Sequence, residues 1–346
     1  MTSFAHCITH WQRHFGRHDL PWQGCRDPYP VWLSEIMLQQ TQVTTVSGYF
    51  PRFMAHFPDV RALAAAPLDA VFSLWAGLGY YARARNLHAC AVKVVAAHGG
   101  KFPETAAALA ELPGIGRSTA AAIAAFAYSE RAAILDGNVK RVLCRCFAIE
   151  GVPVGTVEKE LWALASSLLP ASVDMSVYTQ GLMDLGATLC IARKPRCPEC
   201  PLATSCLAWQ QGRVQDLPTP KIKTRKPQRR SEFLLITDGK NILLQRRPPT
   251  GIWGGLLTPP EGLERLLDFG LSARNLQTLP PRTHVFTHFR LEIHPYLCRV
   301  EQMLLFVSEP GLECLTLEDA LQAGVPAPVS RLLREVMALT SDKRDI

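Results

Sequence analysis

The sequence predicts a mainly α-helical domain followed by a smaller α/β domain. Its 346 residues exceed the length of one ordinary domain and suit two. From about residue 5 to residue 212, apolar residues recur at helical spacing, and Gly and Pro divide the stretch into short helices. From Ser231 onward the pattern becomes strand-like. Hydrophobic residues make up 48% of the chain, which is enough for real cores and excludes wholesale disorder.

The change of pattern predicts a first domain over residues 1–216, a basic linker over 217–230 and a second domain over 231–346. The linker contains three prolines and several Lys and Arg residues, so it is either a solvated spacer or a phosphate-contacting segment. In the second domain, two apolar runs around Asp238–Asn241 predict a hairpin. The alternation over Phe289–His294 predicts a half-buried strand, and Ser330–Leu339 predicts a closing helix.

Composition and the N-terminal sequence argue against a membrane protein and a secreted protein. No apolar run approaches the roughly 20 residues that a membrane helix needs. The N-terminal residues lack the apolar core and small-residue cleavage site of a secretory signal, which predicts a cytoplasmic protein. The formal net charge of +7 permits a polyanionic partner without proving one.

Cysteine usage points to a metal centre. The chain has eleven cysteines, of which four are separated by six, two and five residues: Cys190, Cys197, Cys200 and Cys206. A protein that is not exported stays in a reducing compartment, where its cysteines remain thiols. These four cysteines are therefore predicted to be metal ligands rather than disulfides. The spacing alone leaves tetrahedral zinc and an iron–sulfur cluster both open.

Two further segments carry candidate site residues. In Leu112–Ala120, Gly114 and Gly116 separate two helical segments and would let the backbone approach a phosphate, although an ordinary turn has the same pattern. Asp136 follows in Ile134–Arg141, where an Asp before Gly-Asn is also typical of a turn or a helix cap.

A third segment, Trp32–Val43, is predicted to be one helix. On it, Glu35 would share a face with Leu38, Gln39 and Gln42. The carboxyl group is either a solvated helix residue or, with its mostly apolar neighbours, a buried acid. Burial would raise its pKa and keep it protonated at neutral pH.

Together with Leu20–Trp22 and Gly77–His88, these segments resemble the adenine DNA glycosylases of the MutY type, in the endonuclease III or helix-hairpin-helix superfamily. The resemblance covers essentially the whole chain, with its motifs in the family's order. It implies a helix-hairpin-helix glycosylase domain with a [4Fe–4S] loop, followed by a MutT-like mismatch-recognition domain. The cluster, held by the four cysteines named above, would be mainly structural. Its loop would present Arg193, Lys194 and Arg196 to phosphates; the alternative is a merely solvated loop.

The resemblance also implies roles for the two carboxyl groups. Glu35 stands where the family has the general acid that protonates N7 of adenine. Asp136 stands where the family has a carboxylate near the sugar C1′, which stabilises oxocarbenium charge. Ser118 occupies the position at which bifunctional members carry a lysine. Because serine cannot form an imine, we expect base excision without strand cleavage.

Further positions are implied to contact DNA. Gln40 and Tyr80 match residues that wedge into the duplex as adenine is flipped out, although an isolated Gln or Tyr is more often an ordinary polar or core residue. The hairpin would contact DNA through Gly114, Gly116 and Ser118. Lys140 would reach a phosphate or else remain solvated.

The second domain resembles MutT-like domains at Gly251–Glu261. The following segment, Glu264–Asn275, lacks the glutamate-rich helix that would hold Mg²⁺, so we expect no pyrophosphatase activity. The family's 8-oxoguanine loop reads Phe-Ser-His, and this chain has Phe286, Thr287 and His288. His284 and His288 have a second interpretation as exposed polar residues beside a strand.

The resulting hypothesis is a monofunctional adenine DNA glycosylase that acts in base excision repair. Its partner would be double-stranded DNA with A·8-oxoguanine or A·G mispairs, bound by a monomer that associates with the nucleoid. There are three rival hypotheses. The first is a bifunctional oxidised-pyrimidine glycosylase/lyase, which Ser118 opposes. The second is a non-catalytic DNA-binding regulator with a redox-sensing cluster, and the third is a nucleotide hydrolase, which the missing metal-binding helix opposes.

Overall fold

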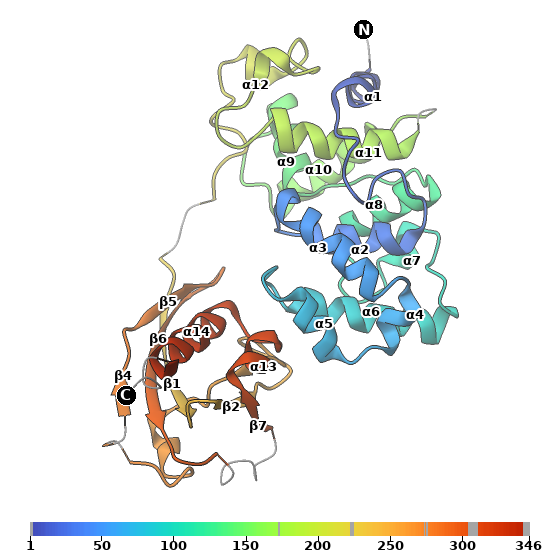
Figure 1. The fold of residues 1–346 in the computed structure, drawn as a ribbon. Coiled ribbons are helices and arrows are strands. Elements are labelled where there is room, and N and C mark those ends of the chain that lie inside the picture. The colour runs from blue at the N-terminus through green and yellow to red at the C-terminus, as the bar shows by residue number, and fades with distance from the viewer. Residues whose placement is uncertain are drawn as a thin grey trace. The chain divides into compact units, whose positions relative to one another are not determined.

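The computed structural model describes residues 3–171, 174–221, 225–272, 274, 276–303 and 311–341. The chain divides into two compact units (Figure 1). The first comprises Met1–Ala65 and Asn86–Lys223, and the second comprises Ala66–Arg85 and Thr224–Ile346. Positions 222–224 of the predicted linker, and 273 and 275 of the segment after the glycine-rich turn, lie outside the described residues.

The first unit is helical, as the sequence predicts. Short polar side chains begin several of its helices; for example, Asp27 accepts a hydrogen bond from the Tyr29 amide, and Thr105 from the Ala108 amide. Helix α6 (Ala82–His98) starts in the second unit and continues into the first. The other helices of this unit are α1 (Phe4–Phe15), α2 (Pro28–Leu38), α3 (Val43–His56), α4 (Val60–Ala65), α7 (Ala106–Leu109), α8 (Arg117–Tyr128), α9 (Gly137–Cys146), α10 (Thr156–Ser167), α11 (Met175–Asp184), a π-helical turn at Leu185–Leu189, a 3₁₀ turn at Cys197–Glu199 and α12 (Leu207–Gln210).

Helix α2 ends earlier than predicted. It stops at Leu38, and the backbone of Gln40 is left-handed, with φ of 57°. Gln42 is extended and precedes α3. The predicted helix over Trp32–Val43 is therefore right up to Leu38 and wrong for residues 39–42. Glutamine favours helix, so local propensity gives no sign of a break that tertiary structure imposes.

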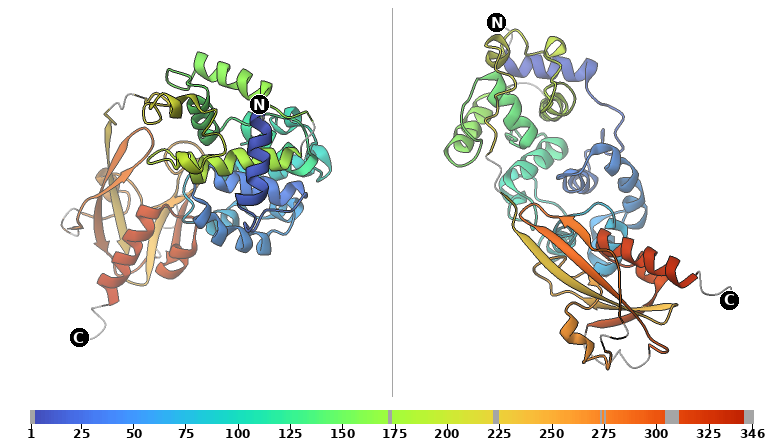
Figure 2. Two further views of the ribbon diagram at one scale, coloured as in Figure 1. Left: turned by 90° about the horizontal axis from the view of Figure 1, so that it is seen from above. Right: turned by 90° about the vertical axis from the view of Figure 1, so that its left-hand side faces the viewer.

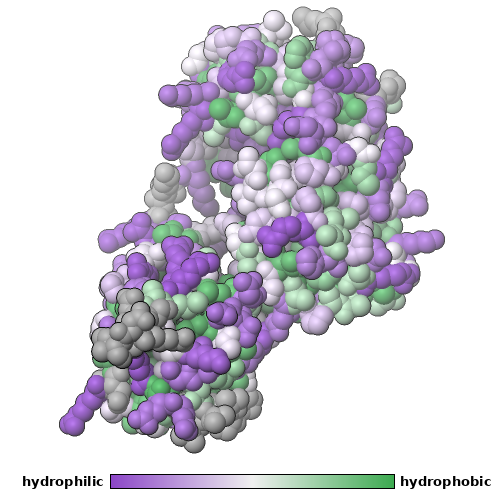
Figure 3. All heavy atoms as spheres, viewed as in Figure 1, coloured by the Kyte–Doolittle hydropathy of each residue, from purple (hydrophilic) through white to green (hydrophobic). Residues whose placement is uncertain are grey.

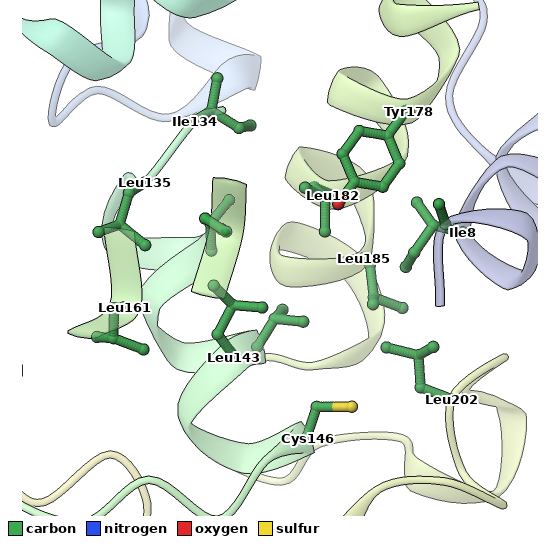
Figure 4. Close-up of a cluster of buried hydrophobic side chains, with 14 of the residues drawn as sticks. Ile8, Ile134, Leu135, Leu143, Cys146, Leu161, Tyr178, Leu182, Leu185 and Leu202 are labelled. Atoms are coloured by element: carbon green, nitrogen blue, oxygen red, sulfur yellow. The ribbon is translucent and has the colours of Figure 1, made fainter. Parts of the chain in front are cut away.

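The core of the first unit lies between α1, α9, α10 and α11. Figure 4 shows Ile8 of α1 facing Tyr178 and Leu182 of α11, with Leu143 of α9 close by. Helix α8 contributes small side chains instead, since residues 120–125 include five alanines and are all buried. Such a core is close-packed, so it holds the first residues of α8 and α9 in fixed positions.

The second unit contains a seven-stranded sheet with the order β3-β2-β1-β6-β4, in which β5 pairs with β6 and β7 pairs with β2. Strands β1 and β6 are parallel over ten residue pairs and run side by side in Figure 2. The other pairings are antiparallel. The strands are β1 (Gln228–Thr237), β2 (Asn241–Arg246), β3 (Leu257–Thr258), β4 (Leu276–Thr278), β5 (Arg282–Val285), β6 (Arg290–Arg299) and β7 (Leu312–Thr316).

Helices and turns complete the second unit. Helices α13 (Leu317–Gln322) and α14 (Ala327–Ser341) pack on one face of the sheet, and a 3₁₀ turn (Leu263–Leu266) packs on the other. Helix α5 (Leu68–Trp75) also belongs to this unit. The predicted hairpin is confirmed by the antiparallel pairing of β1 with β2. The predicted strand and closing helix are confirmed within β6 and α14.

Two observations concern the linker and the surface. Strand β1 begins at Gln228, so the last three residues of the predicted linker are part of the sheet. Hydrophilic side chains are spread over each unit on the face shown in Figure 3. Within the described part of the chain, no helix is both long and apolar enough to cross a bilayer.

Candidate active site

Glu35 lies near the end of α2, a helix anchored by its buried side chains. Trp32, Leu33, Ile36 and Met37 are all at most 2% exposed. Glu35 itself is partly buried and lines a cavity of about 520 Å³ in the first unit. Its helix therefore holds the carboxyl group at a fixed place in the cavity wall.

The cavity has the size and lining of a small-molecule site, for which about 300–1,000 Å³ is typical. Apolar side chains form part of the wall: Leu20, Trp22, Val31, Leu38 and Phe126. Gln23 and Gln180 add amide groups that can hydrogen-bond the edge of a planar base. The lining is mixed, because it also contains Arg13, Arg17, His18 and Arg26, and such a pocket could hold a purine through both apolar and polar contacts.

Arg17 and Asp184 form a buried ion pair beside this cavity that the sequence did not predict. Asp184 is fully buried and accepts hydrogen bonds from the Arg17 backbone amide and Nε at 2.9 and 2.7 Å. It also accepts one from Gln180 Nε2 at 2.8 Å. The pair fixes the segment after α1 against α11. No local pattern marks it, because the partners are 167 residues apart.

Asp136 is the N-cap of α9. Its Oδ1 accepts a hydrogen bond from the Val139 amide at 2.7 Å. The positive end of the helix dipole favours a negative charge at this position. The helix-cap interpretation of Asp136 is thus correct, and it is compatible with a role in the site.

The environments of Glu35 and Asp136 favour a proton on the first carboxyl group and a negative charge on the second. Burial, and then the charge of Asp136, raise the pKa of Glu35 to about 8. No donor among the described residues hydrogen-bonds the Glu35 carboxyl. Burial also raises the pKa of Asp136, but the amides of Val139 and Asn138 and the charge of Arg141 oppose that shift. In this pair the proton therefore belongs on Glu35 and the charge on Asp136.

The hairpin around Gly114 and Gly116 is linked to the segment that carries Asp136. Gly114 has φ of +77°, and a Cβ there would lie 2.7 Å from Cβ of Asn86, so only glycine fits. Gly116 is the N-cap of α8 and has no side chain to occupy the free amides of that helix. Ser118 Oγ accepts a hydrogen bond from the Leu135 amide at 2.9 Å. This bond ties the hairpin to the residue that precedes Asp136.

Gln40 and Tyr80 share an unusual backbone. Both are exposed, and both are left-handed, with φ of 57° and 48°. Non-glycine residues adopt this conformation at some cost, and such residues cluster at ligand-binding positions. The Arg83 guanidinium lies 5.5 Å from the Tyr80 ring centroid and supports it from one side. The two predicted wedge residues belong to different units, Gln40 to the first and Tyr80 to the second.

Lys140, predicted to reach a phosphate, has a partner within the protein. Its Nζ lies 2.8 Å from Oε1 of Glu158. A phosphate contact would have to replace or share this ion pair.

The four predicted ligand cysteines converge on one small cavity, together with Leu189, Trp209 and Val214. Four thiols around an apolar space are a donor set suited to an iron–sulfur cluster. Within the described residues, no three His, Cys, Asp or Glu side chains are arranged to hold a single metal ion. Arg193 and Lys194 of the loop are exposed, whereas Arg196 is paired with Glu199.

Two arginines of α9 hold the cysteine loop. Arg145 is 3% exposed and donates to the carbonyls of Ile191 and Leu217 at 2.7 and 2.8 Å. Its Nη1 also lies 3.5 Å from Cys190 Sγ. Arg141 donates to the Cys190 carbonyl at 2.7 Å. Helix α9 thus joins Asp136 at its first turn to the thiol loop at its last.

In the second unit, Phe286–Phe289 forms a tight turn between β5 and β6, closed by a 2.9 Å bond from the Phe286 amide to the Phe289 carbonyl. The Phe286 ring stacks on Phe289, with centroids 4.5 Å apart, and meets His284 edge-on at 4.6 Å. Thr287 and His288 are exposed at the tip. The sheet therefore presents this loop to solvent with its first ring held in place.

Carboxylates near the glycine-rich turn are paired. Glu261 accepts from the Ser231 hydroxyl at 2.6 Å and pairs with Arg247. Asp268 lies 3.3 Å from Arg265. In its described part the segment has a 3₁₀ turn, Leu263–Leu266, and contains no α-helix.

Comparison with known proteins gives the family. A model of the HhH-GPD superfamily of base excision DNA repair proteins matches residues 33–167, and a NUDIX domain model matches residues 232–335. A protein named adenine DNA glycosylase from Buchnera aphidicola subsp. Acyrthosiphon pisum (strain APS) is 36% identical over 338 residues, covering 95% of this chain and 96% of the relative. One of the same name from Mus musculus is 34% identical over 402 residues, covering 96% and 78%.

The chain belongs to the adenine DNA glycosylase family. This confirms the resemblance and the predicted fold class, a helix-hairpin-helix domain followed by a MutT-like domain. Among solved structures, a thermostable thymine-DNA glycosylase is 30% identical, with a TM-score of 0.54, and covers 60% of this chain and 95% of its own. An endonuclease III–DNA complex is 22% identical with a TM-score of 0.51, which shows a shared fold.

Proposed function

We propose that the chain removes adenine from A·8-oxoguanine and A·G mispairs in duplex DNA and leaves the strand uncut. The observation that carries this is the Glu35 carboxyl, whose pKa is raised to about 8 in a cavity of about 520 Å³, within electrostatic reach of Asp136. Membership of the family supports adenine as the base and base excision repair as the process. The choice of 8-oxoguanine rests on the resemblance of the loop Phe286–His288.

The mechanism uses the two carboxyl groups in turn. Glu35 donates its proton to N7 of the flipped adenine. The bond between C1′ and N9 then breaks, and its electron pair leaves with the base. The Asp136 carboxylate stabilises the positive charge that develops on the sugar. Water adds to C1′, and its proton passes to a carboxylate, which leaves an abasic site.

Ser118 supports hydrolysis without strand cleavage. Its hydroxyl accepts a hydrogen bond from the Leu135 amide and has no amine with which to attack C1′. A lysine at this place would form an imine with the sugar and lead to a lyase reaction.

We further propose that Cys190, Cys197, Cys200 and Cys206 hold a [4Fe–4S] cluster. Their shared apolar cavity and the buried Arg145 beside Cys190 fit such a group. The cluster would supply structural rigidity to the loop that carries Arg193 and Lys194. No step of the base-excision reaction passes through it.

Binding of the duplex would involve both parts of the protein. Residues 1–216 would excise the base, 217–230 would link, and 231–346 would recognise the opposing base. We assign the hairpin at Gly114 and Gly116 to the DNA backbone, and Gln40 and Tyr80 to the gap left by the flipped base. Lys140 would contact a phosphate by exchanging Glu158 for it. A monomer would suffice, because the chain itself carries every residue that this scheme uses.

Gel-resolved excision from A·8-oxoguanine, A·G and A·T duplexes, with and without alkali, tests the proposal. The wild-type protein should cleave the first two only after alkali. Glu35→Gln should reduce the single-turnover rate by about 10²–10⁴-fold while mismatch binding in a gel shift persists. The matched control is Glu261→Gln, a paired carboxylate of the second unit that should excise normally. Wild-type rates in Glu35→Gln would refute the assignment of the acid.

The same assay separates the alternatives. Strand cleavage without alkali, together with efficient trapping of a covalent adduct by borohydride, would favour a bifunctional glycosylase. Tight mismatch binding with no base release would favour a non-catalytic regulator.

A further inference from the structure

A second cavity, of about 280 Å³, lies within the second unit between strand β5 and helix α14. On α14 its lining residues are spaced three and four apart, so they occupy one face of the helix. On β5 they precede the turn Phe286–Phe289 directly. The cavity is lined by Arg282, Thr283, His284, Pro328, Arg331 and Glu335.

The charges around this cavity do not cancel. Arg282 and Glu335 neutralise each other, since Arg282 Nη2 lies 2.9 Å from Glu335 Oε2. Arg331 is exposed, and among the described residues no carboxylate pairs with it. Burial lowers the pKa of the His284 imidazole, and the nearby positive charge of Arg331 lowers it further. A guanidinium group is therefore left available at the mouth of a polar cavity.

The cavity lies directly beside the loop Phe286–His288, which is proposed to recognise 8-oxoguanine. Arg282, Thr283 and His284 of the cavity lining lie on β5, which ends at Val285, and Phe286 opens the turn that follows. His284 also touches Phe286 directly, edge-on at 4.6 Å. The turn Phe286–Phe289 therefore begins two residues after His284, next to the cavity.

We propose that this cavity binds a phosphate group, namely a phosphodiester of the DNA strand that carries the base read by Phe286–His288. Arg331 makes the contact, and Glu335 holds Arg282 beside it. The planar guanidinium suits phosphate oxygens because it can donate two parallel hydrogen bonds. The inference rests on the proposed function of the loop and adds the backbone contact that would set the loop in register with the opposing base.

The salt dependence of DNA binding tests the contact. We would compare Arg331→Ala with Arg334→Ala, which removes an equally exposed arginine of the same helix that does not line the cavity. Both would carry Glu35→Gln to prevent turnover. Loss of one phosphate contact should reduce the slope of log K against log salt by about 1 for both mismatched and undamaged duplexes. The Kd ratio of variant to parent would then fall about fourfold between 50 and 200 mM salt.

Arg334→Ala should keep the parent slope. Equal slopes for Arg331→Ala and its parent, or equal losses in both arginine variants, would overturn the proposal. Arg331→Gln provides a second neutral variant that preserves helix propensity, and both should melt within a few degrees of the parent. Failure of adenine excision by the wild-type protein would instead count against the proposed function, so the two failures are distinguishable.

A free nucleotide offers the same phosphate chemistry, and a separate measurement distinguishes it. Titration of the wild-type protein with dGDP by calorimetry should show no binding that depends on Arg331. Nucleotide binding that is lost in Arg331→Ala but kept in Arg334→Ala would assign the cavity to a free nucleotide and overturn the DNA assignment.

Discussion

Two carboxyl groups, one in each unit, have opposite environments. In the helical unit, Glu35 lines a cavity without a donor among the described residues, and its pKa is raised to about 8. In the sheet unit, Glu261 accepts from a hydroxyl and pairs with Arg247. A buried carboxyl group without partners can hold and release a proton near neutral pH, whereas a paired one is tied to its partner and serves the structure.

The comparison extends to the basic residues. Lys140 and Arg145 are both engaged by groups of the protein, a carboxylate in the first case and backbone carbonyls in the second. Arg331 is charged and unengaged within the described residues. Arg331 could therefore contact a phosphate without giving up a partner, whereas Lys140 would have to exchange Glu158 for it. The variants below test this comparison between engaged and unengaged groups, beginning with the largest expected effect.

Replacing the engaged, buried Arg145 by Met should damage the structure most. The side chain is 3% exposed and donates to carbonyls of both the cysteine loop and Leu217. Its removal leaves these acceptors unsatisfied, so we expect a loss of about 3–5 kcal/mol in the free energy of unfolding. Denaturant unfolding measures the loss, and visible absorbance reports whether the thiol loop still holds a chromophore. Unchanged stability would show that these bonds do not hold the loop.

Asp136→Asn should remove the charge and keep the helix cap, because Asn caps a helix about as well as Asp. We expect a fall of about 10²–10³-fold in single-turnover excision, by analogy with the loss of one fixed electrostatic stabiliser. Asp174→Asn is the control, since Asp174 caps α11 through the Ser176 amide, whereas Asp136 is the carboxylate whose charge acts on Glu35. Similar rates in the two variants would remove Asp136 from the mechanism.

The ionisation of Glu35 should appear in stability as well as in rate. Its folded-state pKa of about 8 lies above the ordinary 4.5, so the folded state binds the proton more tightly than the unfolded state. This contribution is complete below about pH 4.5 and is lost as pH rises through 8. Glu35→Gln, which cannot ionise, should lie close to the parent at pH 4 and exceed its stability by about 4 kcal/mol at pH 8.5, because one pH unit between the two pKa values corresponds to ~1.4 kcal/mol.

Thermal or denaturant unfolding at the two pH values provides that measurement. Single-turnover excision by the wild-type protein should fall over the same range, since Glu35 loses the proton that it donates. A stability difference that is independent of pH would mean that Glu35 is solvated and has an ordinary pKa. That result would remove the contrast between Glu35 and Glu261.

Much of this arrangement could be predicted from local sequence. Helical spacing, the strand-like alternation over Phe289–His294 and the cysteine spacing all depend on residues near one another in the chain. The end of α2 at Leu38 could not be predicted, because Gln39–Gln42 has good helix propensity and the break is imposed by the surrounding fold. The partners of Asp184 and Arg145 were also missed, since they come from distant segments.

The smallest expected effect concerns Ser118, whose role is to position another residue. Ser118→Ala removes the hydrogen bond to the Leu135 amide and leaves that donor unsatisfied, at a cost of about 1–2 kcal/mol in unfolding free energy. Because Leu135 precedes Asp136, we expect excision to slow by several-fold with little change in mismatch binding. Thr119→Ala is the control on the same helix, as Thr119 contacts Gln39 instead. A variant that is destabilised yet excises at the parental rate would show that the bond serves the fold alone.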